Sequence, residues 1–168
     1  MSDKLLFEWT EDFNIGIDEI DEQHQGLVIL LNQLHEAIRE RHGSVASRQI
    51  LDKLVEYTRT HFSLEESLMR LTHYPGWDLH KHQHEDLIRQ VQALQTKLDE
   101  EGIAISFELL HFLKNWLMQH INDSDRRFGI YFQTDGLQKY AGKVSPDELV
   151  QPAGPARKKK WWQRWFRW

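Results

Sequence analysis

The 168-residue sequence contains no cysteine. This absence excludes disulfides, thiolate zinc sites, iron–sulfur clusters and cysteine nucleophiles. No apolar run approaches the roughly 20 residues that a membrane-spanning helix needs. The opening stretch MSDKLLFEWTEDF also lacks the positive and apolar regions of a signal peptide. The sequence therefore predicts a cytoplasmic protein, and its 40% hydrophobic and 28% charged residues are typical of a globular chain.

Charge is distributed unevenly along the chain. The net charge is −5, from 21 Lys and Arg against 26 Asp and Glu. The last twelve residues, RKKKWWQRWFRW, hold six of the cations, no acid and four of the seven tryptophans, which leaves 15 cations and 26 acids in residues 1–156. An acidic body thus precedes a basic, tryptophan-rich tail.

Apolar residues recur at helical spacing in four long segments and alternate at strand spacing in none of them. The predicted helices cover residues 18–41, 47–71, 77–100 and 106–131. Short connections between long helices favour an all-α fold, an up-down-up-down antiparallel four-helix bundle. We assign residues 1–132 to this bundle, with the first seventeen as an N-terminal arm, residues 133–156 to a capping segment and linker, and residues 157–168 to the C-terminal tail.

Each predicted helix places polar side chains on its apolar stripe. The segment THFSLEESLM spaces His61 and Glu65 four positions apart, so both lie on one helix face. The histidines of the HKHQH segment repeat this spacing in the third helix. The full set of candidate ligands is His24, His61, Glu65, His80, His84, His120 and Asp125. Burying these groups is costly unless something compensates, and a bound metal would satisfy every one of them.

The spacing of His120 and Asp125 needs a special local geometry. Five residues separate their directions by about 140° on a regular α-helix. A local π-turn would bring both side chains toward a common centre, and such turns are frequent at functional sites. The sequence therefore predicts a π-turn in this part of the fourth helix.

Simpler interpretations compete with the metal site. A single core histidine is more often a hydrogen-bonded structural residue, and an i, i+4 His–Glu pair is commonly a solvated surface contact. The coincidence of two such pairs with suitable groups on the other two helices favours the metal. The remaining histidines are expected to face solvent or to lie outside the first coordination sphere; they are His35, His42, His73, His82 and His111.

The ligand set suits two ions better than one. Seven protein ligands are too many for a single first-row ion with an open position, but they fit two ions that share bridging carboxylates. Imidazole suits iron, copper, zinc and nickel, whereas carboxylate favours harder ions. A histidine-rich di-iron site stabilises the ferrous state and so favours reversible O₂ binding over O₂ activation.

These motifs resemble the hemerythrin family, and in particular its bacterial single-domain members, over residues 7–132. The similar segments are HFSLEESLM, YPGWDLHKHQH and WLMQHINDSDRRFG, in the family's order and spacing. The Glu-x-x-His motif of ferritin-like di-iron proteins does not fit. The resemblance implies two non-haem iron ions, bridged by carboxylates and an oxo or hydroxo group, with O₂ as the ligand.

The resemblance also implies a role for each candidate residue. His80, His84 and His120 would hold one iron, and His24 and His61 would hold the other, which keeps an open position. Glu65 and Asp125 would bridge the two ions. An apolar oxygen pocket is expected at Leu27, Phe62, Trp116, Leu117 and Ile121, although plain core packing accounts for the same residues.

The expected function is O₂ storage, transport or delivery by a protein that is not an enzyme. An O₂ or redox sensor is one alternative, and a di-iron protein with peroxidase, NO-handling or ferroxidase-like chemistry is another. We expect a monomer.

The C-terminal tail departs from the family pattern. On a helical wheel its aromatic and basic residues separate onto two faces, which is typical of an interfacial membrane helix. Contact with an anionic membrane surface, or with a membrane oxidase, is the first interpretation; a protein partner is the second, and nucleic acid the third. The residues concerned are Lys158, Lys159, Lys160, Trp161, Trp162, Arg164, Trp165, Phe166, Arg167 and Trp168.

Overall fold

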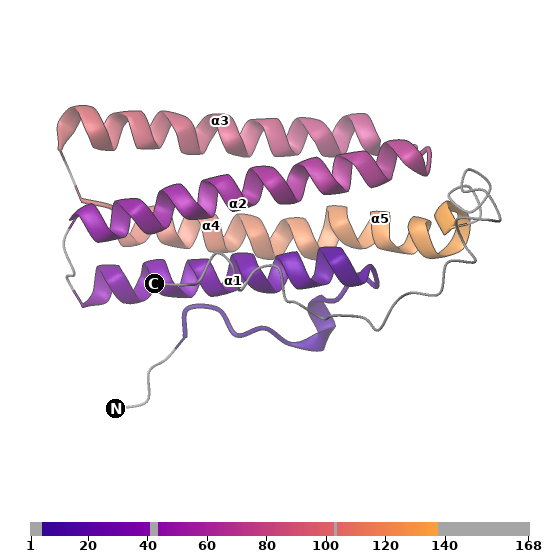
Figure 1. Ribbon diagram of the computed structural model, residues 1–168, viewed down its shortest axis with the longest axis horizontal. Coiled ribbons are helices and arrows are strands. Elements are labelled where there is room, and N and C mark those ends of the chain that lie inside the picture. Colours follow the sequence, from indigo (N-terminus) through magenta and orange to yellow (C-terminus); the bar gives the residue numbers. More distant parts are fainter. Residues whose placement is uncertain (1–4, 41–43, 103, 138–168) are drawn as a thin grey trace, which may run out of the picture.

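The computed structural model describes residues 5–40, 44–102 and 104–137, and these form a bundle of long helices (Figure 1). The predicted tail and most of the linker lie outside the described residues. The helices are α1 (Asp18–Arg39), α2 (Ser44–Leu71), α3 (Trp77–Glu101), α4 (Phe107–His120) and α5 (Arg126–Tyr131). No strand occurs in the described residues. The predicted all-α four-helix bundle is confirmed.

The fourth rod of the bundle is composite. Between α4 and α5 lies a π-helical turn at Ile121–Asp125, and a second π-turn at Phe132–Gly136 follows α5. The π-turn predicted from the spacing of His120 and Asp125 is therefore present. Helical structure also extends five residues beyond the predicted end at 131, into the segment expected to cap the bundle.

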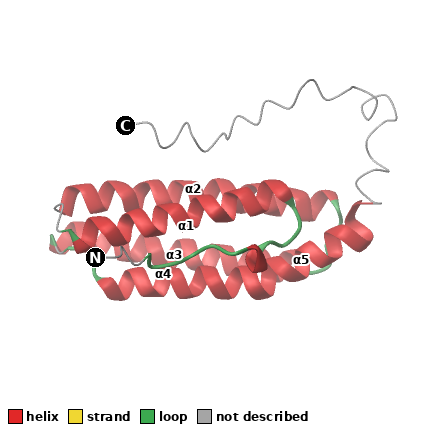
Figure 2. Ribbon diagram, turned by 90° about the horizontal axis from the view of Figure 1, so that it is seen from below, coloured by secondary structure: helices red, strands yellow, loops and turns green. Residues whose placement is uncertain are grey.

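The helices run antiparallel in sequence order, and Figures 1 and 2 show them side by side. α1 packs against α2 and α4, and α2 packs against α3. Two of the boundaries have clear local causes. Ser106 caps α4, because its Oγ accepts a hydrogen bond from the Leu109 amide at 3.3 Å, and α3 ends at Gly102 in the left-handed conformation with a φ of 62°.

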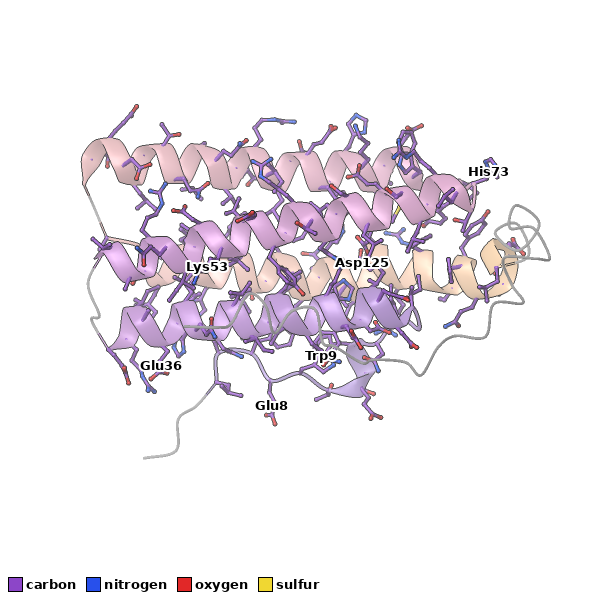
Figure 3. All side chains as sticks on the ribbon, in the orientation of Figure 1. Glu8, Trp9, Glu36, Lys53, His73 and Asp125 are labelled. Atoms are coloured by element: carbon purple, nitrogen blue, oxygen red, sulfur yellow. The ribbon has the colours of Figure 1, made fainter. Side chains whose placement is uncertain are left out.

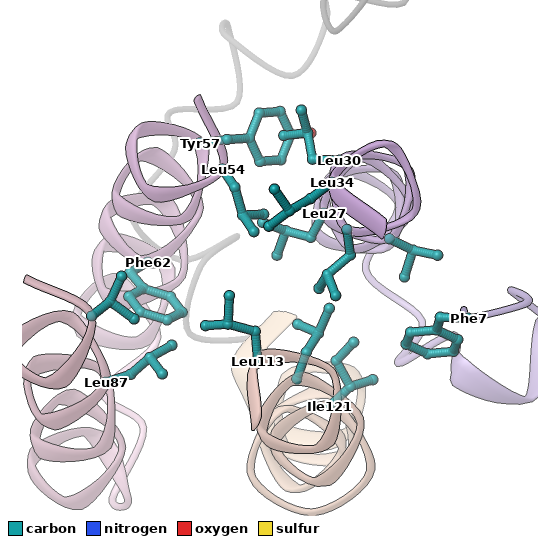
Figure 4. Packing of buried hydrophobic residues seen from close by; sticks show 14 of the residues in the cluster. Phe7, Leu27, Leu30, Leu34, Leu54, Tyr57, Phe62, Leu87, Leu113 and Ile121 are labelled. Atoms are coloured by element: carbon teal, nitrogen blue, oxygen red, sulfur yellow. The ribbon is translucent and has the colours of Figure 1, made fainter. Parts of the chain in front are cut away.

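The core fills the space between all four rods (Figure 4). Leucines from α1 meet Leu54 and Phe62 of α2, Leu87 of α3 and Leu113 of α4. Gly26 lets α1 approach Tyr57, because a Cβ at this glycine would lie 2.2 Å from the Tyr57 hydroxyl oxygen. The glycine therefore accommodates the tyrosine ring, which accounts for a residue that is unfavourable in a helix interior.

The N-terminal arm is fastened to the bundle at several points. Asn32 exchanges two hydrogen bonds with the Phe7 backbone, at 3.0 and 2.8 Å. The buried Asp21 carboxylate accepts hydrogen bonds from the amides of Ile15 and Gly16 at 2.7 and 3.0 Å. The arm also carries a 3-10 turn at Glu11–Phe13, and it holds Trp9 with its ring 6.2 Å from that of His24.

None of the described helices is long and apolar enough to cross a membrane.

Candidate metal centre

The seven predicted ligands meet in the interior of the bundle, where α1, α2, α3 and the π-turn face one another. Figure 3 shows Asp125 pointing in among the helices. His24, Glu65 and Asp125 are completely buried, and His120, the most exposed of the seven, is only 6% exposed. The sequence pattern placed these side chains correctly on the inner faces of their helices.

The ligand atoms form two overlapping groups. One group contains three histidines and both carboxylates: Glu65, His80, His84, His120 and Asp125. The other contains two histidines and the same carboxylates: His24, His61, Glu65 and Asp125. Within each group all ligand atoms lie within 4.8 Å of one another. Glu65 and Asp125 are thus the only residues common to the two groups in the described part of the chain.

The three-histidine group is tightly convergent. The His120 Nε2 atom lies 3.0 Å from His84 Nε2 and 3.1 Å from His80 Nε2. Asp125 Oδ1 lies 3.1 Å from both His80 Nε2 and His120 Nε2. Ligands held about 2 Å from one first-row ion lie at most roughly 4 Å apart, so these distances suit a shared ion.

The two-histidine group is built around the other oxygen of the aspartate. His24 Nε2 lies 3.1 Å from Asp125 Oδ2, and His61 Nε2 lies 3.7 Å from Glu65 Oε2. The two rings stand edge to face with their centroids 4.7 Å apart. This group offers four protein ligands against five in the other, so an ion bound here keeps more room for an external ligand.

The carboxylates themselves provide the test of whether metal fits. All four carboxylate oxygens of Glu65 and Asp125 are buried and have no hydrogen-bond donor in suitable geometry among the described residues. Their short distances to histidine nitrogens are contacts of ion-pair type. Buried carboxylates without donors are strongly unfavourable, and metal cations bound to these oxygens would remove the penalty. The donor set therefore fits two ions.

The close packing of the carboxylates against the histidines also shifts the pKa values of these groups. Burial alone would raise the pKa of Glu65, but the neighbouring imidazoles of His61, His80 and His84 hold it below its usual range. Asp125 behaves in the same way, with His120 contributing most to lowering its pKa against the effect of burial. Both carboxylates are therefore ionised at neutral pH and available as ligands.

The pKa values of the histidines shift in different directions. Burial lowers the pKa of His61 to about 3, so its ring is neutral. Burial also lowers the pKa of His80, but its contacts with Asp125 and Glu65 outweigh this effect and raise the value to about 9. For His84 the contacts with Glu65 and Glu66 likewise outweigh burial and raise the pKa. Metal would have to displace a proton from His80.

Aromatic side chains hold two of the ligand rings. Phe62 stacks on His84 with centroids 3.6 Å apart and planes 3° from parallel. Trp116 stacks on His120 at 4.3 Å and 15°. Both aromatic residues were predicted as parts of an oxygen pocket, and they also orient ligands.

An apolar cavity of about 30 Å³ lies beside the cluster. Four of the five predicted pocket residues line it, and Ile121 is completely buried but does not. The sequence pattern missed further lining residues, which share the same helical stripes: Leu31, Leu54, Thr58, Leu87 and Leu113. The Thr58 hydroxyl donates to the Leu54 carbonyl at 2.7 Å, so it offers the cavity no free donor.

The sequence pattern also missed two outer partners of the ligands. Gln23 Oε1 lies 2.8 Å from His61 Nδ1, and Glu66 Oε1 lies 3.1 Å from His84 Nδ1. Each directly adjoins a ligand in the sequence, Gln23 before His24 and Glu66 after Glu65. Adjacency alone was no usable signal, because consecutive residues point about 100° apart on a helix.

The remaining histidines behave as predicted where they are described. His73, His82 and His111 are exposed; the latter two contact the carbonyl oxygens of Asp78 and Phe107, each at 2.7 Å. His35 is half-buried. His42 lies outside the described residues.

Comparison with known proteins agrees with this geometry. Residues 15–129 match the Hemerythrin HHE cation binding domain. The chain belongs to the hemerythrin family. This family is known for O₂ binding at a di-iron centre, and the match spans all seven candidate ligands.

Individual hemerythrin relatives cover most of the chain. It is 37% identical over 123 residues to a bacteriohemerythrin of Stenotrophomonas maltophilia, covering 73% of this chain and 79% of that protein. It is 29% identical to a myohemerythrin of Theromyzon tessulatum, covering 73% and 90% respectively. A crystal structure of wild-type hemerythrin superposes with a TM-score of 0.70 at 27% identity, over 74% of this chain and 95% of the other.

Proposed function

We propose that this protein binds two iron ions at the candidate centre and binds O₂ reversibly there, as a store or carrier. The observation that carries the proposal is the pair of overlapping ligand groups, which share Glu65 and Asp125 and offer five and four protein ligands. Two unequal positions of this kind would leave the ion in the smaller group with more room for a small external ligand. When bound, the iron pair supplies the electrons that bind O₂.

The residues of the chain support iron in particular. Five imidazoles and two carboxylates form a mixed nitrogen and oxygen set that suits first-row transition metals. Each carboxylate offers two oxygens and belongs to both groups, so Glu65 and Asp125 would be shared by the two ions. The two Asp125 oxygens already face different groups, one toward His80 and one toward His24. The cation-binding domain of the family is consistent with this choice.

The apolar surroundings favour carriage over catalysis. The adjoining cavity is lined by eight apolar side chains and Thr58, so its lining contains no titratable group that could act as a general acid or base. Its apolar lining also keeps water from that side of the cluster, which should slow loss of the ferrous state. We therefore propose a non-enzymatic role. We also propose that the protein is a cytoplasmic monomer, as expected from the sequence.

The C-terminal tail extends the proposal to delivery. Its six cations and four tryptophans would attract the chain to an anionic membrane surface, where membrane-bound enzymes use O₂. Vesicles containing anionic lipid should sediment the full chain but not a chain ending at Pro155. Equal sedimentation of the two would remove the membrane role and leave O₂ binding untouched.

The decisive experiment is anaerobic reconstitution. The apo protein should take up two ferrous ions per chain, and mixing with O₂ in a stopped-flow instrument should give a long-lived coloured adduct that reverses under vacuum. Rapid decay to the ferric state without reversal would instead support sensing or peroxidase-like chemistry. Failure to retain iron would refute the proposal.

A further inference from the structure

Two of the candidate ligands have outer hydrogen-bond partners of different charge. The His61 ring approaches the Gln23 amide oxygen through Nδ1, and the His84 ring approaches the Glu66 carboxylate through Nδ1. In both rings Nε2 faces Glu65 instead, at 3.7 and 3.4 Å. A histidine that gives its Nε2 lone pair to a metal carries its proton on Nδ1, so both rings donate Nδ1–H outward.

The surroundings of the two partners account for the difference in charge. Gln23 is buried, only 6% exposed, in the interior of the bundle. The Glu66 side chain is 21% exposed and lines a groove of about 370 Å³ on the surface between α2 and α3, together with Arg59, Arg89 and His84. A charge at position 66 therefore keeps contact with water, whereas a charge at position 23 would be desolvated.

The two acceptors act differently on their imidazoles. A carboxylate that accepts Nδ1–H makes the ring a better electron donor to a metal at Nε2 than a neutral amide does. Hydrogen bonds to a charged acceptor are also roughly twice as strong as those between neutral groups. His84 belongs to the three-histidine group and His61 to the two-histidine group. Among the described contacts, the carboxylate-supported ring therefore lies on the three-histidine side.

We infer that Glu66 and Gln23 are positioning residues that make the two metal positions unequal in reduction potential. Glu66, acting through His84, favours the higher-charged ion in the three-histidine group. Gln23, acting through His61, leaves the two-histidine group with a preference for the lower charge. One-electron oxidation of the loaded centre by a mediator therefore removes the electron from the three-histidine side. This inference rests on the proposed function, since it requires iron in both groups.

The first test is Glu66→Gln in the iron-loaded full chain. Glutamine keeps an oxygen acceptor near His84 Nδ1 and removes only the charge. The midpoint potential of the first one-electron step, measured by spectroelectrochemistry, should rise. A tenfold loss of the ferric over ferrous preference corresponds to about 59 mV. An unchanged midpoint potential would overturn the inference.

A matched control separates the hydrogen bond from general charge. Glu85 lines the same groove but is paired with Lys81, and it is not a partner of any ligand histidine. Glu85→Gln removes one charge from the same surface. It should shift the midpoint potential by only a small fraction of the shift seen in Glu66→Gln. Equal shifts in both variants would overturn the inference, because they would show a surface effect.

The second test exchanges the two partners. The double variant Gln23→Glu, Glu66→Gln keeps the net charge of the chain but inverts the asymmetry. Mössbauer spectra of the half-oxidised centre should then place the ferric signal at the iron with fewer protein ligands, the opposite of the unmodified chain. A ferric signal that stays in place would count against the inference.

Co²⁺ titrated under anaerobic conditions provides a readout independent of electron transfer. Co²⁺ affinity should change less in Glu66→Gln than in Glu66→Ala, which loses the acceptor altogether; loss of such outer partners typically weakens metal binding 10- to 100-fold. Equal Co²⁺ affinity in all three proteins would contradict a positioning role. An unmodified chain that retains no iron refutes the proposed function, whereas two retained irons with unaltered potentials refute only this inference.

Discussion

At the scale of single residues, the candidate centre is distinguished by two buried carboxylates whose oxygens a bound cation would satisfy. The oxygens of Glu65 and Asp125 lie at zero side-chain exposure without hydrogen-bond donors among the described residues. The sequence allowed this to be predicted, because a carboxylate on the apolar stripe of a helix is too costly to bury without a compensating partner. It did not reveal Gln23 and Glu66, since residues adjacent to a ligand point about 100° away from it on a helix.

Glu65→Ala should reduce the iron content from two ions per chain to one or none. The substitution removes a ligand common to both groups, so neither position keeps its full set. Metal analysis of protein loaded anaerobically measures the effect. Glu56→Ala, at an exposed position of the same helix, is the control and should retain both ions. Two ions in the Glu65 variant would contradict a bridging role.

Metal uptake should release protons near neutral pH. In the metal-free protein His80 has a pKa of about 9, so at pH 7 metal must displace its proton, whereas His61, with a pKa of about 3, has none to lose. Apparent affinity should therefore rise up to tenfold per pH unit between pH 7 and 9 for this proton and level off above. Competition titrations with a chelator whose own protonation is known measure the slope. A flat profile would contradict the prediction.

The raised pKa of His80 also affects the stability of the metal-free protein. Because its folded value lies above the ordinary 6.5, the folded state holds the proton more tightly than the unfolded state. This contribution is complete below pH 6.5 and is lost as the pH rises through about 9.

At the scale of the elements, local sequence signals predicted helix boundaries, and the spacing of two candidate ligands predicted the π-turn inside the fourth rod. The predicted starts of the first and third helices agree with the structure, and Pro75 and Gly76 mark the end of α2. The π-turn was predictable only because His120 and Asp125 had to face one centre. The second π-turn was missed, since no ligand pair revealed it and Phe132–Gly136 carries an ordinary turn-like sequence.

Gly26→Ala should destabilise the bundle although alanine is the better helix former. The added Cβ would lie 2.2 Å from the Tyr57 hydroxyl oxygen and 2.6 Å from its Cζ. Overpacking of this kind costs about 1–3 kcal/mol, against a gain of about 1 kcal/mol in helix propensity. Urea denaturation measures the free energy of unfolding.

The Gly26 prediction has an internal control in a double-mutant cycle with Tyr57→Phe. Removing the hydroxyl relieves the closest contact, so the alanine should cost less in the phenylalanine background. Equal costs in both backgrounds would show that the Tyr57 hydroxyl is not the obstacle.

At the scale of the whole molecule, the candidate metal centre takes its residues from all four rods of the bundle. Its ligands come from α1, α2, α3 and the α4 segment with its π-turn. Bound ions should therefore stabilise the entire fold, and their removal should loosen the packing of every helix against its neighbours. The antiparallel arrangement was predictable because long helices joined by short connections favour it.

Iron or cobalt should raise the melting temperature of the apo protein. A ligand at a thousand times its dissociation constant stabilises the native state by about 4 kcal/mol, which corresponds to a shift on the order of 10 °C for a domain of this size. Calorimetry with and without metal measures the shift. The Glu65→Ala variant should show a much smaller one, and an equal shift would place the stabilising ion elsewhere.

Phe62 has two roles, and this matters for any attempt to alter gas binding by substitution. The same ring bounds the cavity and braces His84, so trimming it alters storage space and coordination together. Leu31 and Leu113 also border the void, one or two turns farther from the metal end. Substitutions of these leucines would change the volume of the cavity without altering the positions of the candidate metal ligands.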